Sequence, residues 1–501
     1  MRRVALEKHS RTETHRHAAS SLRIPLAILL LSSCTVGPDY VRPQLEIPAT
    51  WEEKSAGTAP ADLGSWWDAL GDTELDELVQ RGVAGNLDLR QAVGRVQEAR
   101  AFYQVAKSAQ FPELDADADA FHERASANGI FPGGEAVNVF DVGVSASWEV
   151  DVFGRVRRSV ESASANVQAS EDDRRAVLVA VIAEVAASYV DIRTLQRRLR
   201  VNSANLDSQG KIVDLTKVRF ENGIASGLDV AQAESVYAET LAAIPVLELA
   251  LEQEYNRLSV LLGENPGSVR RELAIVWAIP MPPDNLDAGL PADLVRQRPD
   301  IRQAERRLAA ETARIGVATA DLYPRFVLLG TFGFDATKVA DLFQGSSRTY
   351  SVGPTMVWNL FDAGRIRGLI HVEEARTAQA LAFYEQTVLQ GLSEVENALL
   401  AFVRLRQERD AVIDAVDAAS LSLELATDLY KDGVVDFQNV LDAQRTVLRF
   451  QELLAITEGA IVQSVVQLYR ALGGGWKIEE PTEQPASTPE QQEENEAPEA
   501  S

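Results

Sequence analysis

The two halves of this sequence align with each other at an offset of about 210 residues, so the chain contains an internal repeat. The segment NLDLRQAVGRVQEARAFYQVAKSAQFPEL at 86–114 aligns with RPDIRQAERRLAAETARIGVATADLYPRF at 298–326, at an offset of 212. WEVDVFGR at 148–155 aligns with WNLFDAGR at 358–365, at an offset of 210, so the segment 113–147 is about two residues longer than its copy. Each half is therefore expected to form the same supersecondary unit.

Each half is predicted to contain a helix, two strands and a hairpin of long helices, in that order. The first repeat is assigned to 71–285, with a β-hairpin at 111–151 and a helical hairpin at 154–262. The second repeat is assigned to 286–476, with the corresponding hairpins at 324–362 and 364–472. The remaining segments are a signal at 1–33, an extended segment at 34–70 and an acidic tail at 477–501.

The longest helices are predicted from apolar residues repeated every seven positions. No proline occurs between 155 and 220, so a helix there would be on the order of 100 Å long. The return helices are expected at about 228–262 and 438–472, and Pro245 is expected to kink the first of them. The pattern is coiled-coil-like but not a strict two-position heptad. Its two rows are Leu178, Val185, Ile192, Leu199, Leu206, Val213 and Phe220, then Val388, Val395, Phe402, Arg409, Val416, Leu423 and Tyr430.

The segments between these helices alternate apolar and polar residues, as strands with one apolar face do. One interpretation packs four strands on the helices as a soluble α+β core. The other turns the apolar face to lipid and the Asp- and Ser-rich face to a water-filled lumen. Four strands cannot close a barrel, so the second interpretation requires an oligomer. Pro354 suggests a bulge or break in the last strand, and the residues predicted to face lipid are Trp148, Phe326, Phe332, Phe334, Met356 and Trp358.

The N-terminal segment has the pattern of an export signal. A basic stretch precedes the apolar run IPLAILLL at 24–31 and the small residues Ser32 and Ser33, and this run is too short to span a bilayer. LSSC, which ends at the only cysteine, Cys34, resembles the lipobox of bacterial lipoproteins. That resemblance implies cleavage before Cys34 and attachment of lipid such as palmitate, with about 0.8 kcal/mol of membrane affinity per buried methylene. Thr35 at the next position resembles a sorting signal for the outer membrane. The alternative to a lipid-bearing Cys34 is a cysteine buried in the core.

Composition excludes several classes of function. The net charge of −25 argues against nucleic acid as a partner. The tail at 479–501 has eight glutamates and no lysine or arginine, so it is expected to be disordered. Beyond the signal only His122 and His371 remain, without metal-ligand or catalytic-triad spacing. No enzyme activity, cofactor or metal is therefore predicted.

The order of these motifs resembles one family. Cys34 and VGPDYVRP at 36–43 are followed by SWWDALGDTELDELV at 65–79, the FP and YP pairs, DVFGRVR, NLFDAGRIR and YKDGVVDFQNVLDAQRTVL at 430–448. From Cys34 to about Trp476 the chain resembles TolC-type outer-membrane efflux proteins. It is most similar to their lipid-anchored NodT/OprM-like branch, which serves RND multidrug efflux pumps.

The resemblance implies an α+β membrane protein that assembles as a homotrimer. Three chains would each contribute four strands to a 12-stranded transmembrane β-barrel, and the long helices would form a periplasmic α-barrel. The implied function is the exit duct of a tripartite efflux pump in the outer membrane of a Gram-negative bacterium. The implied partners are a periplasmic adaptor, an inner-membrane RND-type transporter and outer-membrane lipid.

The resemblance also implies a periplasmic entrance where the long helices turn, at 220–229 and 430–442. Gly223 and Gly433 suit these bends, because glycine accepts positive φ. Asp229 and Asp442 stand where members of the family place constriction residues, and a trimer would turn each into a ring of carboxylates. Capping of the next helix is the competing role for Asp229. Asn439 replaces a second acidic residue found in relatives, and the residues expected to form ion pairs are Lys431, Asp432, Asp436 and Arg445.

A second function remains open from the residues alone. A soluble periplasmic coiled-coil adaptor or scaffold lipoprotein would share the long helical hairpins. It would have no use for four alternating strands at matching points of both repeats. The strands therefore favour the channel.

Overall fold

A computed structural model describes residues 35–52, 63–128, 134–283, 291 and 297–476. The predicted signal at 1–33, Cys34 and the acidic tail lie outside the described residues. The chain divides into two compact units. The sheet unit comprises Met1–Tyr40, Tyr103–Ala163 and Glu311–Arg376, and the helical unit comprises Val41–Phe102, Ser164–Ala310 and Thr377–Ser501.

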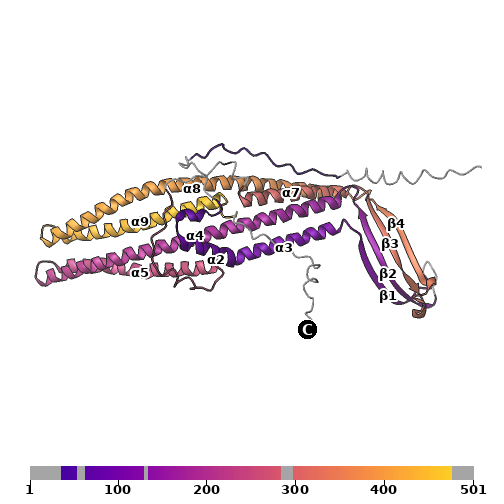
Figure 1. The fold of residues 1–501 in the computed structure, drawn as a ribbon, viewed down its shortest axis with the longest axis horizontal. Coiled ribbons are helices and arrows are strands. Elements are labelled where there is room, and N and C mark those ends of the chain that lie inside the picture. Colours follow the sequence, from indigo (N-terminus) through magenta and orange to yellow (C-terminus); the bar gives the residue numbers. More distant parts are fainter. Residues whose placement is uncertain (1–34, 53–62, 129–133, 284–290, 292–296, 477–501) are drawn as a thin grey trace, which may run out of the picture. The chain divides into compact units, whose positions relative to one another are not determined.

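The duplication appears directly in the lengths of the elements, which Figure 1 traces from indigo to yellow. Helices α3 (Leu87–Ser108) and α7 (Pro299–Ala320) each have 22 residues. The long helices α4 (Arg155–Glu221) and α8 (Arg365–Lys431) each have 67 residues. The return helices α5 (Gly227–Leu261) and α9 (Phe437–Ala471) each have 35 residues, and α5 continues through Pro245. Two short helices, η2 (Trp66–Leu70) and α2 (Thr73–Gly85), precede α3.

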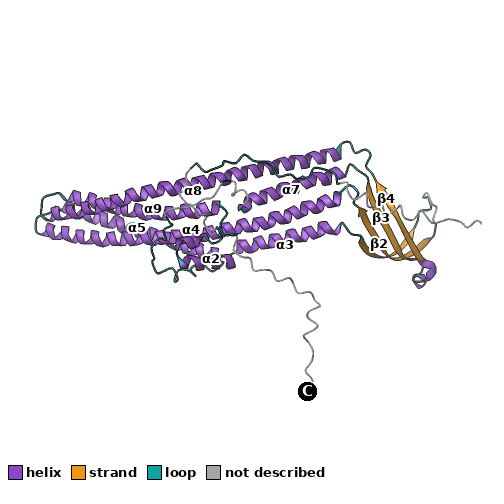
Figure 2. Ribbon diagram, turned by 45° about the horizontal axis from the view of Figure 1, so that its top comes forward, coloured by secondary structure: helices purple, strands orange, loops and turns teal. Residues whose placement is uncertain are grey.

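The sheet unit contains four antiparallel strands in chain order, side by side in Figure 2. They are β1 (Glu113–Arg124), β2 (Ala136–Val150), β3 (Arg325–Ala336) and β4 (Arg348–Val357). Each repeat supplies one hairpin, and pairing of β2 with β3 joins the two repeats. The short 3-10 turns η3 (Val339–Asp341) and η4 (Gly345–Ser347) lie in the β3–β4 connection.

Two expectations for the last strand are wrong. Pro354 causes no break, because β4 stays in register through the pairing of Leu328 with Pro354. β4 is an edge strand of this sheet, where proline is tolerated if its missing N–H would point away from the neighbour. Trp358 was expected on the strand face, but β4 ends one residue earlier, at Val357.

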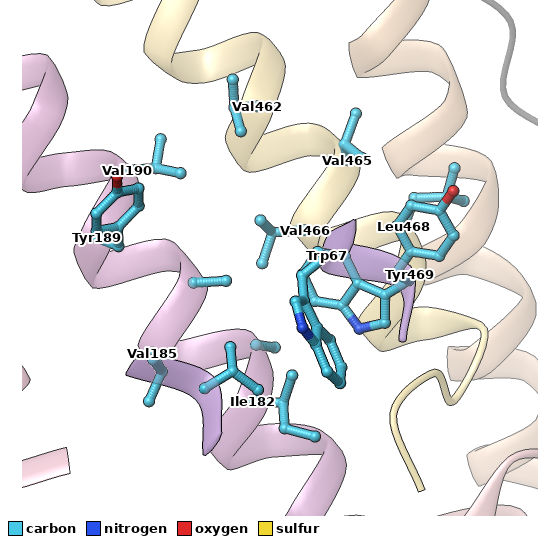
Figure 3. Close-up of a cluster of buried hydrophobic side chains, with 14 of the residues drawn as sticks. Trp67, Ile182, Val185, Tyr189, Val190, Val462, Val465, Val466, Leu468 and Tyr469 are labelled. Carbon is cyan, nitrogen blue, oxygen red and sulfur yellow. The ribbon is translucent and has the colours of Figure 1, made fainter. Parts of the chain in front are cut away.

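The core of the helical unit forms where the middle of α4 meets α8, α9 and the short helices. Trp66 stacks on Tyr469 with ring centroids 5.1 Å apart, and Ile182 and Val466 are fully buried nearby. Figure 3 shows the side chains of this cluster from α4 and α9 together with Trp67. Burial of this many large apolar side chains is the main stabilising contribution to the unit.

A buried arginine ties α2 to α4 inside this unit. The Arg193 side chain is 0% exposed and donates to the side chains of Glu74 and Gln196 and to the Ile275 carbonyl. Burial raises the pKa of Glu74, although the charge of Arg193 acts in the opposite direction. The α2 helix is further fixed by Asp72, which accepts from the Glu74 and Leu75 amides at 3.0 and 3.3 Å.

Within the described ranges, no helix combines the length and the apolar character needed to cross a membrane.

Truncation of Ile182 should destabilise the helical unit in a graded way. Ile182→Ala removes a fully buried side chain, and we expect it to lower the free energy of unfolding by about 2–5 kcal/mol. Ile182→Val, the matched control, should lower it by about 0.5–1.5 kcal/mol. Urea unfolding of the detergent-solubilised chain followed by circular dichroism measures both. Equal midpoints for the two variants would contradict the placement of Ile182 in the core.

Candidate functional sites: the two faces of the sheet and the helical turns

One face of the sheet is apolar and exposed. Residues opposite each other in an antiparallel pair share a face, and the pairings align Val144 with Phe332 and Phe332 with Tyr350. Phe332 and Tyr350 are 50% and 78% exposed. Of the residues predicted to face lipid, those that this register places together on the apolar face are Trp148, Phe326, Phe332, Phe334 and Met356.

The opposite face is mainly polar, although Val327 and Leu329 of β3 also lie on it. The same pairings place Asp117 opposite Gly143, Ser145 opposite Thr331 and Thr331 opposite Ser351. The two faces therefore differ in polarity across all four strands. This separation is what a sheet between hydrocarbon and water requires.

The two tryptophans of the repeated motif make the same contact. Trp148 Nε1 donates to the Gln110 carbonyl and Trp358 Nε1 to the Leu322 carbonyl, each at 3.1 Å. Each acceptor follows the end of α3 or α7, so each indole closes a junction between helix and strand. The bond also explains why Trp358 stays at the foot of the sheet although β4 has ended.

The acidic residues of the same motif begin the long helices. Asp151 Oδ2 accepts from the Arg157 amide at 2.9 Å, and Asp362 Oδ2 accepts from the Ile366 amide at 2.9 Å. These bonds satisfy amides in the first turns of α4 and α8, which have no partner within the helix. The bond to Ile366 holds the pKa of Asp362 below its usual value.

The helical turns lie at the far ends of α4 and α8, within the helical unit. Gly223 and Gly433 have φ of 69° and 73°, which is the left-handed conformation that glycine adopts at helix ends. Beyond them, Ile224 N donates to Arg219 O at 2.8 Å and Val434 N donates to Leu429 O at 2.9 Å. The two turns are therefore built alike.

Asp229 is part of a helix cap. Ser226 N donates to Asp229 Oδ2 at 3.0 Å, and Asp229 N donates to Ser226 Oγ at 3.2 Å, forming a reciprocal capping box at the start of α5. The competing role considered for Asp229 is thus realised, with Ser226 as the N-cap residue. One carboxylate oxygen of Asp229 is engaged in this cap.

Asp442 is placed differently. It is exposed one turn into α9 and accepts from Gln438 Nε2 at 2.9 Å. Asn439 donates to the Asp436 carbonyl at 3.2 Å, and Asp436 is the N-cap residue of α9 without a side-chain cap bond. Asp442 and Asp436 are therefore both predicted entrance residues at exposed positions in the single chain.

The expected ion pairs between the turn residues do not form within the described chain. Lys431 pairs with Asp428 one turn earlier, with Nζ 3.0 Å from Oδ1. Arg445 is exposed and has no ion pair to the described residues around it. Neither cation therefore forms an ion pair with Asp436 among the described residues.

A contact that the sequence did not reveal joins the two turns. Arg219 Nη1 donates to the Lys431 carbonyl at 2.8 Å, and its guanidinium lies 4.6 Å from the centroid of the Tyr430 ring. Tyr430 is 5% exposed and packs against Phe437, whereas its repeat counterpart Phe220 is 50% exposed. Burial raises the pKa of Tyr430, and the charge of Asp229 adds to the shift. The seven-residue pattern treats Phe220 and Tyr430 alike, so it gives no signal for this contact.

Comparison with known proteins agrees with this geometry. The family model described as outer membrane efflux protein matches residues 78–264 and again 290–474. Nodulation protein T of Rhizobium leguminosarum bv. viciae is 35% identical over 474 residues, covering 92% of this chain and 96% of that protein. Outer membrane protein OprJ of Pseudomonas aeruginosa is 33% identical over 465 residues, covering 90% and 95%.

Solved structures share the fold. A structure of the outer-membrane channel OprN superposes with a TM-score of 0.83 at 35% identity, covering 88% of this chain and all of that one. The open state of the MtrE outer membrane channel of Neisseria gonorrhoeae gives a TM-score of 0.76 at 26% identity, with coverage of 89% and 99%.

Fold and sheet together define an outer-membrane channel protein with an internal repeat. The chain belongs to the outer membrane efflux protein family, and each match of the family model falls on one repeat. The predicted family and the predicted role as an outer-membrane efflux duct are confirmed. The alternative of a soluble adaptor is therefore set aside.

Removal of the Arg219 contact should loosen the two turns from each other. Arg219→Ala deletes both the hydrogen bond to Lys431 and the cation–π contact with Tyr430, which contribute about 1 kcal/mol each. Spin labels at Ile224→Cys and Val434→Cys, both at exposed positions, should then give a broader distance distribution. Arg445→Ala is the matched control and should leave the distribution unchanged. An unaltered distribution in Arg219→Ala would show that this contact does not hold the turns.

Proposed function

We propose that three copies of this chain form one duct. The observation that supports this proposal is the difference in polarity between the two faces of the sheet. β1 and β4 are the open edges of a four-stranded sheet, and hydrocarbon has no hydrogen-bonding partners for their free N–H and C=O groups. Pairing β4 of one copy with β1 of the next removes every edge and closes a barrel of twelve strands. The apolar face then contacts lipid, and the polar face lines the lumen.

The other parts of the chain take their roles from this arrangement. The long helices extend the duct through the periplasm to an entrance at the helical turns. A periplasmic adaptor and an RND-type inner-membrane transporter deliver substrate, and the duct conducts it passively without catalysis. The repeats assigned to 71–285 and 286–476 supply equivalent parts of the wall, with the acidic tail at 477–501 left in solvent.

Anchoring completes the proposed placement. Removal of residues 1–33 leaves Cys34 as the lipid-bearing N-terminus in the outer membrane. Apolar residues gather at the foot of the sheet, and Phe111, Leu360 and Phe361 are 62%, 78% and 88% exposed. Together with Trp358 they suit the interface between lipid and water, where amphipathic indole rings are favoured.

At the entrance, Asp442 is the proposed ring residue. Its carboxylate is exposed and bound only to Gln438 among the described contacts, so threefold symmetry would bring three such groups together. Asp229 instead stabilises the start of α5 through its capping box. The different contacts of these two aspartates support different proposed roles for them.

Lipid-phase labelling tests the two faces. A membrane-partitioned thiol reagent should modify Phe332→Cys and Tyr350→Cys but not Thr331→Cys or Ser351→Cys, because these neighbours alternate between faces. The native Cys34 would carry lipid and stay unreactive. Heat-modifiable migration on unboiled gels reports assembly of each variant. Equal labelling of all four positions would refute the membrane orientation.

Neutralisation of Asp442 tests the entrance. Asp442→Asn removes three carboxylates from the proposed ring, so the cation-over-anion permeability ratio in planar bilayers should fall. Asp229→Asn should instead leave that ratio unchanged and lower the stability by about 0.3–1 kcal/mol, because a negative charge is lost from the first turn of α5. A ratio that follows Asp229 rather than Asp442 would reverse the assignment.

A further inference from the structure

The segment Thr35–Asp39 is seated in a notch of the sheet unit. Arg158 on α4 donates from Nε to the Val36 carbonyl at 3.2 Å and from Nη2 to the Gly37 carbonyl at 3.3 Å. The same Nη2 contacts Asp39 Oδ1 at 2.6 Å. The Arg158 side chain is only 4% exposed, whereas that of Asp39 is 87% exposed. Most hydrogen bonds of the buried guanidinium are therefore donated to this short segment. Its remaining bond is donated to Glu161 on the same helix, at 2.8 Å.

Backbone contacts on both sides make the fit close. Val36 N donates to the Phe153 carbonyl at 3.1 Å, just beyond the end of β2. Gly37 has φ of 89°, and a Cβ there would lie 2.4 Å from Gly316 Cα on α7. A Cβ on Gly316 would lie 2.7 Å from Arg158 Cγ, and a Cβ on Gly154 would lie 2.7 Å from Thr35. Three glycines are thus required where segment, notch and arginine meet.

The residues that form this notch are not repeated in the other half of the chain. At the repeat offset of 210, the counterpart of Arg158 is Gly368, and at the offset of 212 the counterpart of Gly316 is Gln104. A Cβ on Gly368 would meet nothing within 4 Å. Sequence similarity between the repeats is high around these positions, so the two substitutions mark a feature that only one side of the chain needs. The chain has only one N-terminal segment to hold.

We propose that Arg158 and Gly316 form a dock that fixes the lipid anchor to the foot of the sheet. The inference rests on the proposed lipid attachment at Cys34. A Cα–Cα step of about 3.8 Å joins Cys34 to Thr35, and Thr35 contacts Gly154 between β2 and α4. Docking therefore sets the height of the acyl chains relative to the apolar face. The acyl chains then enter the leaflet at the foot of the sheet, and the sheet is held at the bilayer while it meets its partner copies. Arg158 is a positioning residue for the anchor, not part of the conduit.

Asp-N protease tests the dock on the full-length chain in detergent micelles. It cuts before Asp39 only when the segment leaves the notch, and mass spectrometry counts chains beginning at Asp39. Arg158→Gln and Gly316→Ala should raise the rate of this cut by about tenfold or more, since bonds to a charged group shift a local opening equilibrium by such a factor. Gly368→Ala and Arg376→Gln are matched controls, because Gly368 is uncrowded and Arg376 forms an exposed pair with Glu373. Both control variants should be cut before Asp39 at the wild-type rate. Cleavage of Arg158→Gln at the wild-type rate would overturn the dock.

The consequence for assembly is measured in cells. Incorporation of an alkyne fatty acid should be equal in wild type and variants, whereas the heat-stable oligomer should fall relative to membrane-attached single chains in Arg158→Gln and Gly316→Ala. Undiminished oligomer in variants whose segment is released would overturn the positioning role. Absence of fatty acid from the wild type would instead refute the proposed lipid attachment. Protease protection would still report the dock, so the two failures are distinguishable.

Discussion

The structure depends on one constraint: a four-stranded antiparallel sheet cannot be exposed to hydrocarbon while its two edges are open. Each unpaired N–H or C=O in a bilayer costs several kcal/mol, and β1 and β4 each present a row of them. The apolar face that includes Phe332 and Tyr350 cannot face water over its whole area either. Closure by identical copies satisfies both demands without any additional chain.

Duplication supplies the matching ends that such a closure needs. Each repeat ends its hairpin with the same indole contact, made by Trp148 and Trp358. Each then begins a 67-residue helix at a carboxylate that accepts an early amide. These junctions orient a strand and a long helix in the same way twice. The repeats differ at positions where only one of them has a partner to bind. Arg158 binds the N-terminal segment, whereas its repeat counterpart is Gly368. Tyr430 is buried between the two turns, whereas its repeat counterpart Phe220 is exposed.

Most of the fold could be predicted from the sequence because it depends on periodicity. Seven-residue spacing and the absence of proline predict α4 and α8, and alternation predicts the strand faces. Side-chain partners could not be predicted in the same way. Arg219 reaches Tyr430 only because two turns far apart in the sequence lie together. The end of β4 before Trp358 was missed because alternation continues into the loop, where the indole binds a carbonyl instead.

The two faces of the sheet, taken together, decide between the two interpretations that alternation alone left open. Asp119 is paired with Asp141, and Asp141 with Asp335, so three carboxylates stand in one row across three strands. Like charges directly opposite each other are destabilising, and in a packed core of low dielectric the repulsion would be far greater. Water and mobile cations screen it. A soluble α+β core could leave this row in water, but it would cover the apolar face opposite, where Phe332 and Tyr350 are 50% and 78% exposed. A closed sheet around an aqueous lumen gives each face the solvent that it requires.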